Sequence, residues 1–206
     1  MAHSQRRQLN GRGVENPDRR LGFGLKNPEY KAAVMEASKN KSLLKFMVEK
    51  SDQMAEAVGD TESSTYSRAA ANIAEVLKKY VRIAGKFDQL AQDPAKQYDK
   101  VMERFLGSHA SIVDSFLCKA VEKIKGTRER DKLVAALGEG EGFKTAEGYE
   151  VSIDSLSGQD QPRVRLKFSR ENDDPEKSYE LDEEVPLEVL DDIIKEGKFE
   201  QVVAAT

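Results

Sequence analysis

The spacing of apolar residues changes once along this chain, and this change restricts the fold more than any other feature of the sequence. Up to the glycine-rich run at residues 138–142, apolar residues recur every three or four positions, which is the period of helices buried along one face. Beyond that run they alternate with polar residues, as in strands with one buried face. Helices followed by strands predict an α+β protein, with an antiparallel helical bundle ahead of a small antiparallel β-meander.

The strongest helical pattern lies between Ser64 and Gln92. Its apolar residues keep the helical spacing throughout, which predicts one helix of roughly 40 Å at about 1.5 Å per residue. The residues expected on its buried face are Tyr66, Ala69, Ala70, Ile73, Leu77, Tyr80, Val81, Ala84 and Phe87.

Capping residues and helix breakers predict the other helices of the bundle. Asn27-Pro28-Glu29 has the residues of a helix start, and this helix should end near Ala37. Ser42 is expected to cap a second helix that runs through Val58. Further helices are expected after Asp93-Pro94, with Tyr98, Val101, Met102, Phe105 and Leu106 inward; after Gly107-Ser108, with Ile112, Val113, Phe116, Leu117, Ala120, Val121 and Ile124; and from Thr127, with Leu133, Val134 and Leu137.

Three alternating segments and one helix are predicted after the glycine-rich run. The apolar residues of the segments are Tyr149, Val151 and Ile153; Val164, Leu166 and Phe168; Tyr179 and Leu181. In a meander, the middle strand would carry a solvent-facing basic row between two acidic rows: Arg163, Arg165 and Lys167 between Glu150 and Asp154 on one side and Glu180 and Asp182 on the other. Pro186 should open a final helix that closes at Lys195 and Gly197, and residues 199–203 are expected to form a strand or a tail.

The first 26 residues read as a basic arm rather than as a folded unit. They contain five Arg and one Lys against two acids, a net charge of +4, with isolated apolar residues and no period. Such a segment buries too little surface to offset its ordering entropy, so we expect an arm that is disordered or ordered by a partner. Leu21, Phe23 and Leu25 alternate with glycine and could dock as an extended plug on this chain or on a neighbour.

These patterns divide the chain into three parts: the arm at 1–26, the helical bundle at 27–138 and an acidic β-β-β-α part at 139–206. The glycine-rich run would be the hinge between the second and third parts. The third part has eight basic and 19 acidic residues, a net charge of −11, whereas the bundle has a net charge of +3. This asymmetry favours charged partners or an end-to-end contact.

Residues suited to catalysis or metal binding are few. Of two His, His3 lies in the arm and His109 is expected as a partly buried structural residue at a helix start. The single Cys118 has no predicted basic partner, which favours an inert thiol. We therefore predict no catalytic residues, no metal and no cofactor. The single Cys, the lack of a long apolar stretch and the absence of an apolar segment behind the charged N-terminus lead us to expect an intracellular, cytoplasmic protein.

The sequence thus favours a non-enzymatic interaction or assembly protein that engages a protein partner or another copy of itself. Two alternatives stay open: a nucleic-acid-binding accessory protein that uses the arm and the helical bundle, and an enzyme whose carboxylates converge only in the folded chain. The partner-binding residues expected in the arm are Arg6, Arg7, Arg12, Arg19, Arg20, Leu21, Phe23 and Leu25. The acidic docking patch is expected at Asp182, Glu183, Glu184, Asp191 and Asp192.

Overall fold

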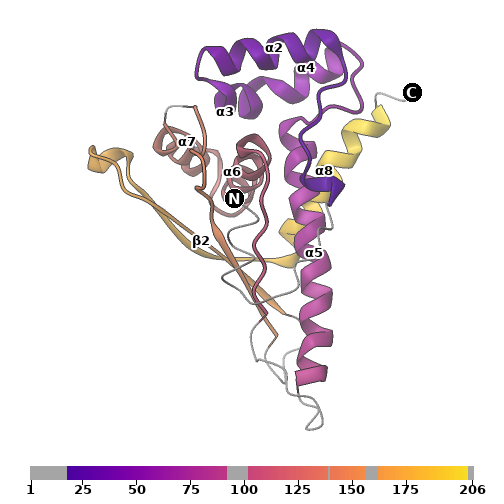
Figure 1. Ribbon diagram of the computed structural model, residues 1–206, viewed down its shortest axis with the longest axis vertical. Helices are drawn as coiled ribbons and strands as arrows, with labels where there is room; N and C mark the ends of the chain where they lie inside the picture. The colour runs from indigo at the N-terminus through magenta and orange to yellow at the C-terminus, as the bar shows by residue number, and fades with distance from the viewer. Residues whose placement is uncertain (1–17, 92–101, 139, 156–161, 204–206) are drawn as a thin grey trace.

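The computed structural model describes residues 18–91, 102–138, 140–155 and 162–203. Its order of elements, helices first and then three strands and a last helix, confirms the α+β class (Figure 1). The elements are η1 (Arg19–Leu21), α2 (Pro28–Lys39), α3 (Leu43–Phe46), η2 (Met47–Ser51), α4 (Asp52–Ala57), α5 (Tyr66–Ala91), α6 (Ala110–Lys125), α7 (Thr127–Ala136), β1 (Glu150–Asp154), β2 (Arg163–Arg170), η3 (Pro175–Lys177), β3 (Tyr179–Val185) and α8 (Leu187–Val203).

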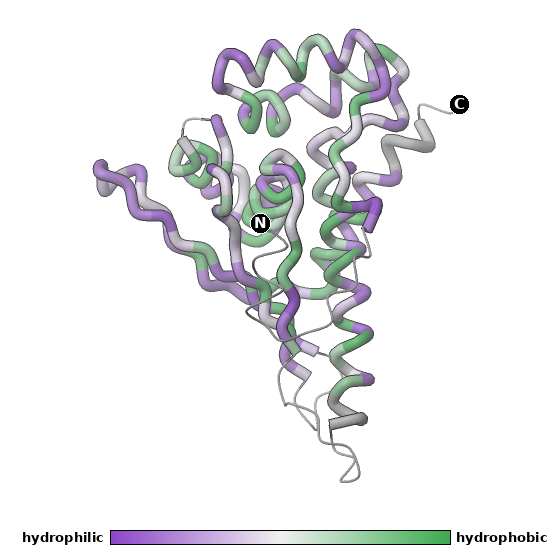
Figure 2. The backbone as a smooth tube through the Cα atoms, in the orientation of Figure 1, coloured by the Kyte–Doolittle hydropathy of each residue, from purple (hydrophilic) through white to green (hydrophobic). Residues whose placement is uncertain are grey.

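Helix α6 lies at the centre of the molecule, and Figure 2 shows a largely hydrophobic backbone there. It contacts α3, α5, α7 and α8. Ten of its 16 residues are buried, and they include the polar Ser111, Asp114 and Ser115 as well as Cys118. The apolar spacing predicted one buried face, but neighbouring elements cover both faces. The polar residues opposite Phe116 therefore lie inside the protein, where each needs a hydrogen-bond partner.

Helices α5 and α8 pack closely along each other, and Gly197 makes this approach possible. A Cβ atom at Gly197 would lie 2.5 Å from Cβ of Ala71 and 2.7 Å from the carbonyl oxygen of Ser67. The sequence pattern predicted that Gly197 ends the helix, and this is wrong: α8 continues to Val203. Residues 199–203 are accordingly helical, neither a strand nor a tail. Gly197 therefore allows close packing of α8 on α5 and does not end the helix.

The sheet is an antiparallel meander in the order β1-β2-β3. Its inner face is apolar, with Val164, Leu166 and Phe168 of β2 buried. On the outer face the register places Arg165 between Ser152 and Glu184, and Lys167 between Glu150 and Asp182. Arg165 also forms an ion pair with Asp182. The predicted arrangement, a basic middle row between acidic outer rows, is therefore confirmed.

One hydrophobic core contains residues from both sides of the glycine-rich run. It joins α5, α6 and α7 to the inner face of the sheet and to Leu190 and Ile193 of α8. Packing therefore does not separate residues 27–138 from residues 139–206, although the change in period suggested a boundary there. The period shows that a face is buried, but not which element buries it.

The expected hinge at residues 138–142 is a docked turn where the structure describes it. The carbonyl of Gly140 accepts hydrogen bonds from the amides of Leu44 (2.7 Å) and Lys45 (3.4 Å), at the start of α3. Gly140 has φ +106°, and a Cβ atom there would lie 2.8 Å from Cβ of Lys45. Glycine is needed at this position both for its backbone conformation and for the close contact.

Helices α2 to α4 form a small hairpin over one end of the bundle, around Tyr30, Val34 and Ala55. Asn27 caps α2 as expected, accepting hydrogen bonds from the amides of Glu29 and Tyr30. Ser42 precedes the next helix but makes no capping bond. That helix also contains the π-helical segment η2, which the sequence did not reveal.

The helix expected after Asp93-Pro94 is not present in its described part. Residues 92–101, which include Tyr98 and Val101, lie outside the described residues, and residues 102–109 form no helix. Phe105 and Leu106 are 65% and 47% exposed, so the expectation that they and Met102 face inward in a helix is wrong. Helical spacing of apolar residues alone therefore did not identify a helix here.

Candidate interaction surface

The second half of the predicted arm is attached to the body as an extended strap at residues 22–26. The amide of Gly24 donates to the hydroxyl of Ser64 (3.0 Å), and the amide of Ser64 donates to the carbonyl of Gly24 (2.8 Å). The amide of Lys26 donates to the hydroxyl of Ser63 (2.6 Å). Phe23 contacts both hydrophobic clusters. These contacts fix the strap to the turn that precedes α5.

A single 3-10 turn, η1, precedes the strap and packs against α5. Asp18 caps this turn by accepting from the amide of Arg20 (3.1 Å), and the guanidinium of Arg20 donates to the same carboxylate. The hydrogen bond from Arg20 is the main cause that lowers the pKa of Asp18 to about 2, and the charge of Lys79 lowers it further. Arg20 also lies 3.9 Å from Glu75 of α5. The chain thus enters the described structure beside Lys79.

The eight arm residues predicted to bind a partner fall into three groups. Arg6, Arg7 and Arg12 lie outside the described residues. Arg19 is exposed and forms no ion pair with any described residue. The remaining four make contacts within the chain: Arg20 with Asp18, Leu21 and Phe23 with the main core, and Leu25 with the small cluster. The apolar plug therefore docks on this chain.

Helix α5 carries a row of cations that the sequence reading did not single out. Between Tyr66 and Phe87 its exposed residues are Lys79, Arg82 and Lys86, and all three are basic. None of them pairs with a carboxylate within the described residues, and the guanidinium of Arg82 donates only to the carbonyl of Lys78 (3.4 Å). Positions i, i+3 and i+7 share one face of a helix. The signal was available in the positions opposite the predicted apolar face. We call these three residues the basic row.

The five acids of the predicted acidic docking patch all lie near cations of this chain. Glu184 lies opposite Arg165 in the sheet. The other four acids pair with cations of this chain: Asp182 with Arg165, Glu183 with Lys125, Asp191 with Lys78 and Asp192 with Lys195. Glu196, on α8, similarly pairs with Lys119 and Lys123. A basic partner that bound these acids would have to compete with the cations that already pair with them.

The chain matches no family model, no curated protein and no solved structure. Among the described residues, no group of three or more His, Cys, Asp or Glu is placed to hold a metal ion. Within the same part of the chain, no helix is long and apolar enough to cross a membrane.

Asp114 is the buried ionisable residue with the clearest role in the fold. It is 1% exposed and accepts hydrogen bonds from the amide of Phe143 at 3.2 and 3.3 Å, one to each carboxylate oxygen. Burial raises its pKa to about 8; the charge of Glu147 adds to this rise, and the hydrogen bond from Phe143 and the charge of Arg170 oppose it. Asp114 thereby fastens the end of the glycine-rich run to α6.

Cys118 and His109 occupy positions that differ in accessibility. Cys118 is fully buried, and burial raises its thiol pKa well above the usual value, as an inert thiol requires. His109 is exposed at the N-cap of α6 and makes no capping bond, so the expectation of a partly buried His is wrong. Its ring lies 6.0 Å from that of Phe23, between the start of α6 and the strap.

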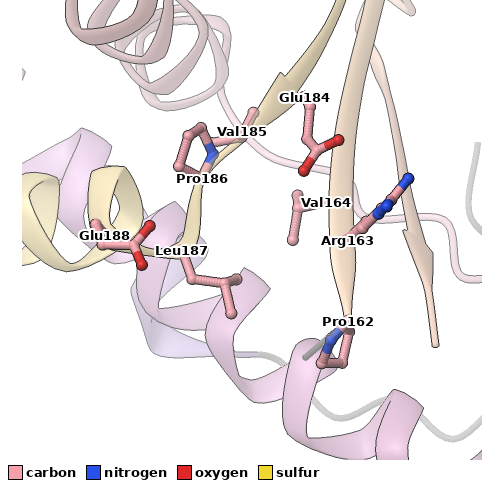
Figure 3. A pocket seen from close by; sticks show the side chains of 8 residues that line it. All are labelled: Pro162, Arg163, Val164, Glu184, Val185, Pro186, Leu187 and Glu188. Atoms are coloured by element: carbon pink, nitrogen blue, oxygen red, sulfur yellow. The ribbon is translucent and has the colours of Figure 1, made fainter. Parts of the chain in front are cut away.

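A hollow of about 260 Å³ lies at one end of the sheet, where β2 begins and β3 leads into α8 (Figure 3). Arg163, Glu184 and Glu188 are its charged residues, and Pro162, Val164, Val185, Pro186 and Leu187 complete the lining. A carboxylate dyad for acid–base chemistry needs two groups whose pKa values are pushed apart by burial or by each other. Arg163, Glu184 and Glu188 are exposed here, so this hollow does not supply that environment.

Proposed function

We propose that this protein is a non-enzymatic interaction protein that binds an acidic partner through its N-terminal arm and the adjacent face of α5. The observation that carries the proposal is the basic row: every exposed residue of α5 up to Phe87 is a cation without a described carboxylate partner. Unpaired surface cations create a local positive potential, although the chain as a whole has a net charge of −4.

The anchored strap joins the arm to this surface. Because η1 packs on α5 beside Lys79, the arm starts next to the basic row. Arg12 is six positions before Asp18, so the chain keeps Arg12 within about 20 Å of this point. Arm and basic row therefore act on the same region of a partner.

Self-association through the acidic end is the competing form of this proposal. The acids expected to receive the arm are already paired or lie opposite a cation within the chain, as Asp182 and Asp191 are. A basic segment that bound there would have to compete with these ion pairs. An external acidic partner meets no such competition, and the proposal favours it.

The test is affinity capture from a cell extract with two immobilised proteins, the full chain and a chain that starts at Asp18. Thermal unfolding of both proteins serves as the control for folding. We expect the shorter chain to keep its melting temperature and to lose captured partners that the full chain releases as salt is raised. If both chains capture the same partners to the same extent, the arm does not bind them and the proposal fails.

A further inference from the structure

We infer that the basic row binds the phosphate backbone of a nucleic acid without reading its bases. The inference rests on the proposed function and names the chemistry of its partner. It is carried by the geometry of Lys79, Arg82 and Lys86, by what surrounds them and by the composition of the arm.

The basic row is linear. Lys79 and Lys86 are seven residues apart on one helix, which corresponds to about 10 Å along the helix axis, and Arg82 lies between them. A nucleic-acid backbone presents single negative charges in a line, and binding proteins neutralise these charges with Lys and Arg. A line of cations that form no ion pair with a described carboxylate suits that ligand, although the charge of Asp18 lies near Lys79 at one end of the row. Binding of such a backbone does not need a precise arrangement of hydrogen-bond donors. The long, flexible side chains of the basic row would not hold one.

The surroundings of the basic row argue against an acidic protein as the partner. Stable protein interfaces are organised around buried apolar or aromatic anchors, with charged residues at the rim. Between Tyr66 and Phe87, however, α5 exposes no residue other than the three cations. A surface of charge without anchors gives binding that depends on counterion release, which is the main source of affinity for nucleic-acid backbones.

The arm sequence is consistent with the same ligand. Arg6, Arg7 and Arg12 are separated by Gln8, Leu9, Asn10 and Gly11, with a further glycine at position 13. Arginine donates to phosphate from a planar group, and arginine-rich segments that lack an apolar core bind nucleic acid without a prior fold.

The outer face of the sheet offers a contrast within the same molecule. Arg163, Arg165 and Lys167 also form a row, but each lies opposite a carboxylate on a neighbouring strand. The total positive charge of the two rows is equal, whereas their surroundings differ. The basic row of α5 is the one whose charge stays available to a phosphate backbone.

The experiment measures binding of labelled single-stranded and duplex oligonucleotides by fluorescence anisotropy over a range of salt concentrations. A labelled polyglutamate peptide tests for an acidic-protein ligand. The full chain is compared with a row variant carrying Lys79→Gln, Arg82→Gln and Lys86→Gln. The control variant carries Lys31→Gln, Lys39→Gln and Lys50→Gln, three exposed lysines of the α2–α4 hairpin that form no ion pair with any residue in the described structure. Both variants change the net charge equally.

We expect the full chain to bind duplex of any sequence and to lose affinity as salt rises. The row variant should reduce the slope of log K against log salt by about 2.7, because each lost duplex contact removes about 0.9. The control variant should leave the slope unchanged. Thermal unfolding checks that the row variant is folded. The single substitution Lys86→Gln carries less risk to folding, and it should reduce the slope of log K against log salt by about 0.9.

Four results would overturn the inference. Equal slopes for the row variant and the full chain would show that α5 does not contact the ligand. An equal decrease of the slope in the row variant and the control variant would show that only the net charge of the chain matters, not the position of the cations. Binding of polyglutamate without binding of oligonucleotides would replace the nucleic acid by an acidic protein and leave the proposed function standing, whereas failure to bind either ligand would contradict both.

Discussion

Among single residues, Asp114 places the strongest physical demand on the fold. Its carboxyl group is buried in the core, where a charged form is costly, and burial raises its pKa to about 8. The charged or titratable groups near it are Glu147, Arg170, Cys118 and Tyr149. The residue holds the amide of Phe143 in place. At neutral pH this bond is therefore made mainly by a protonated carboxyl group.

This pKa shift predicts a pH-dependent stability. Between about pH 4 and pH 8 the folded chain keeps a proton on Asp114 that the unfolded chain has lost, so the contribution of Asp114 to stability falls as pH rises through this window. The slope is at most about 1.4 kcal/mol per pH unit. Asp114→Asn keeps an acceptor for Phe143 but does not titrate. Its free energy of unfolding, measured with urea across the window, should exceed that of the natural chain increasingly toward pH 8.

The difference between the two proteins is the informative quantity, because other carboxylates contribute equally to both. If the difference is constant from pH 4 to pH 8, Asp114 is ionised in the folded state throughout and the assignment of its burial is wrong.

At the scale of elements, two glycines on packed helices have opposite requirements. A Cβ atom at Gly197 of α8 would overlap Ala71 and the backbone at Ser67, whereas a Cβ atom at Gly85 of α5 would meet nothing within 4 Å. We expect Gly197→Ala to lower the free energy of unfolding by about 1–3 kcal/mol through overpacking. Gly85→Ala should raise it by about 0.5–1 kcal/mol, as in an open helix position.

Urea unfolding of the two variants makes the comparison, and Gly85→Ala is the matched control for the substitution itself. Equally small changes in the free energy of unfolding for Gly197→Ala and Gly85→Ala would contradict the close packing of α8 on α5.

The described part of the predicted arm, from Asp18, is docked on the body. Deleting residues 1–17 removes no contact of the described structure. Deleting residues 1–26 also removes Phe23 and Leu25 from the hydrophobic clusters and the strap's hydrogen bonds to Ser63 and Ser64. We expect the first deletion to leave the melting temperature unchanged and the second to lower the free energy of unfolding by at least about 2 kcal/mol.

Thermal and urea unfolding of both truncated chains would test this boundary. A loss of stability in the shorter deletion would place structural contacts before Asp18, and no loss in the longer deletion would contradict the docking of the strap.

The elements that were predictable share one property: their signal is local. The face of α5, the cap at Asn27 and the alternation around Arg165 each follow from neighbours in sequence, and the structure agrees with all three. Gly197 was misread because glycine favours both helix ends and close helix contacts, and sequence alone does not separate these uses.

At the scale of the whole molecule, the sequence could not show how the two periodic parts meet. Amphipathic spacing predicted that Leu77 and Leu166 are buried, but not that they share one core. The candidate surface was only partly visible in the sequence, which marks the positions opposite the apolar face of α5 but not which of them stay exposed. Its residues are defined by exposure, and exposure of Lys79 and Arg82 depends on where η1, α6 and α8 cover α5. Tertiary packing decides both points.

Whether a charged residue of this molecule is available to a partner depends on its neighbours in the fold. The part of the sequence in which the residue lies does not decide it. Most acids of the C-terminal patch are paired within the chain, while the cations beside the arm are not. We propose that this positive surface, whose cations pair with no described carboxylate, binds a polyanion. The affinity of the intact chain for a polyanion should then depend on counterion release.

The most direct measurement is the salt dependence of duplex binding by the full, unsubstituted chain. Three contacts from Lys79, Arg82 and Lys86 give a slope of log K against log salt of about −2.7, and contacts from Arg6, Arg7 and Arg12 extend it to about −5. The account predicts a linear plot with a slope in this range for any duplex sequence. A slope near zero, or no binding at low salt, would contradict it.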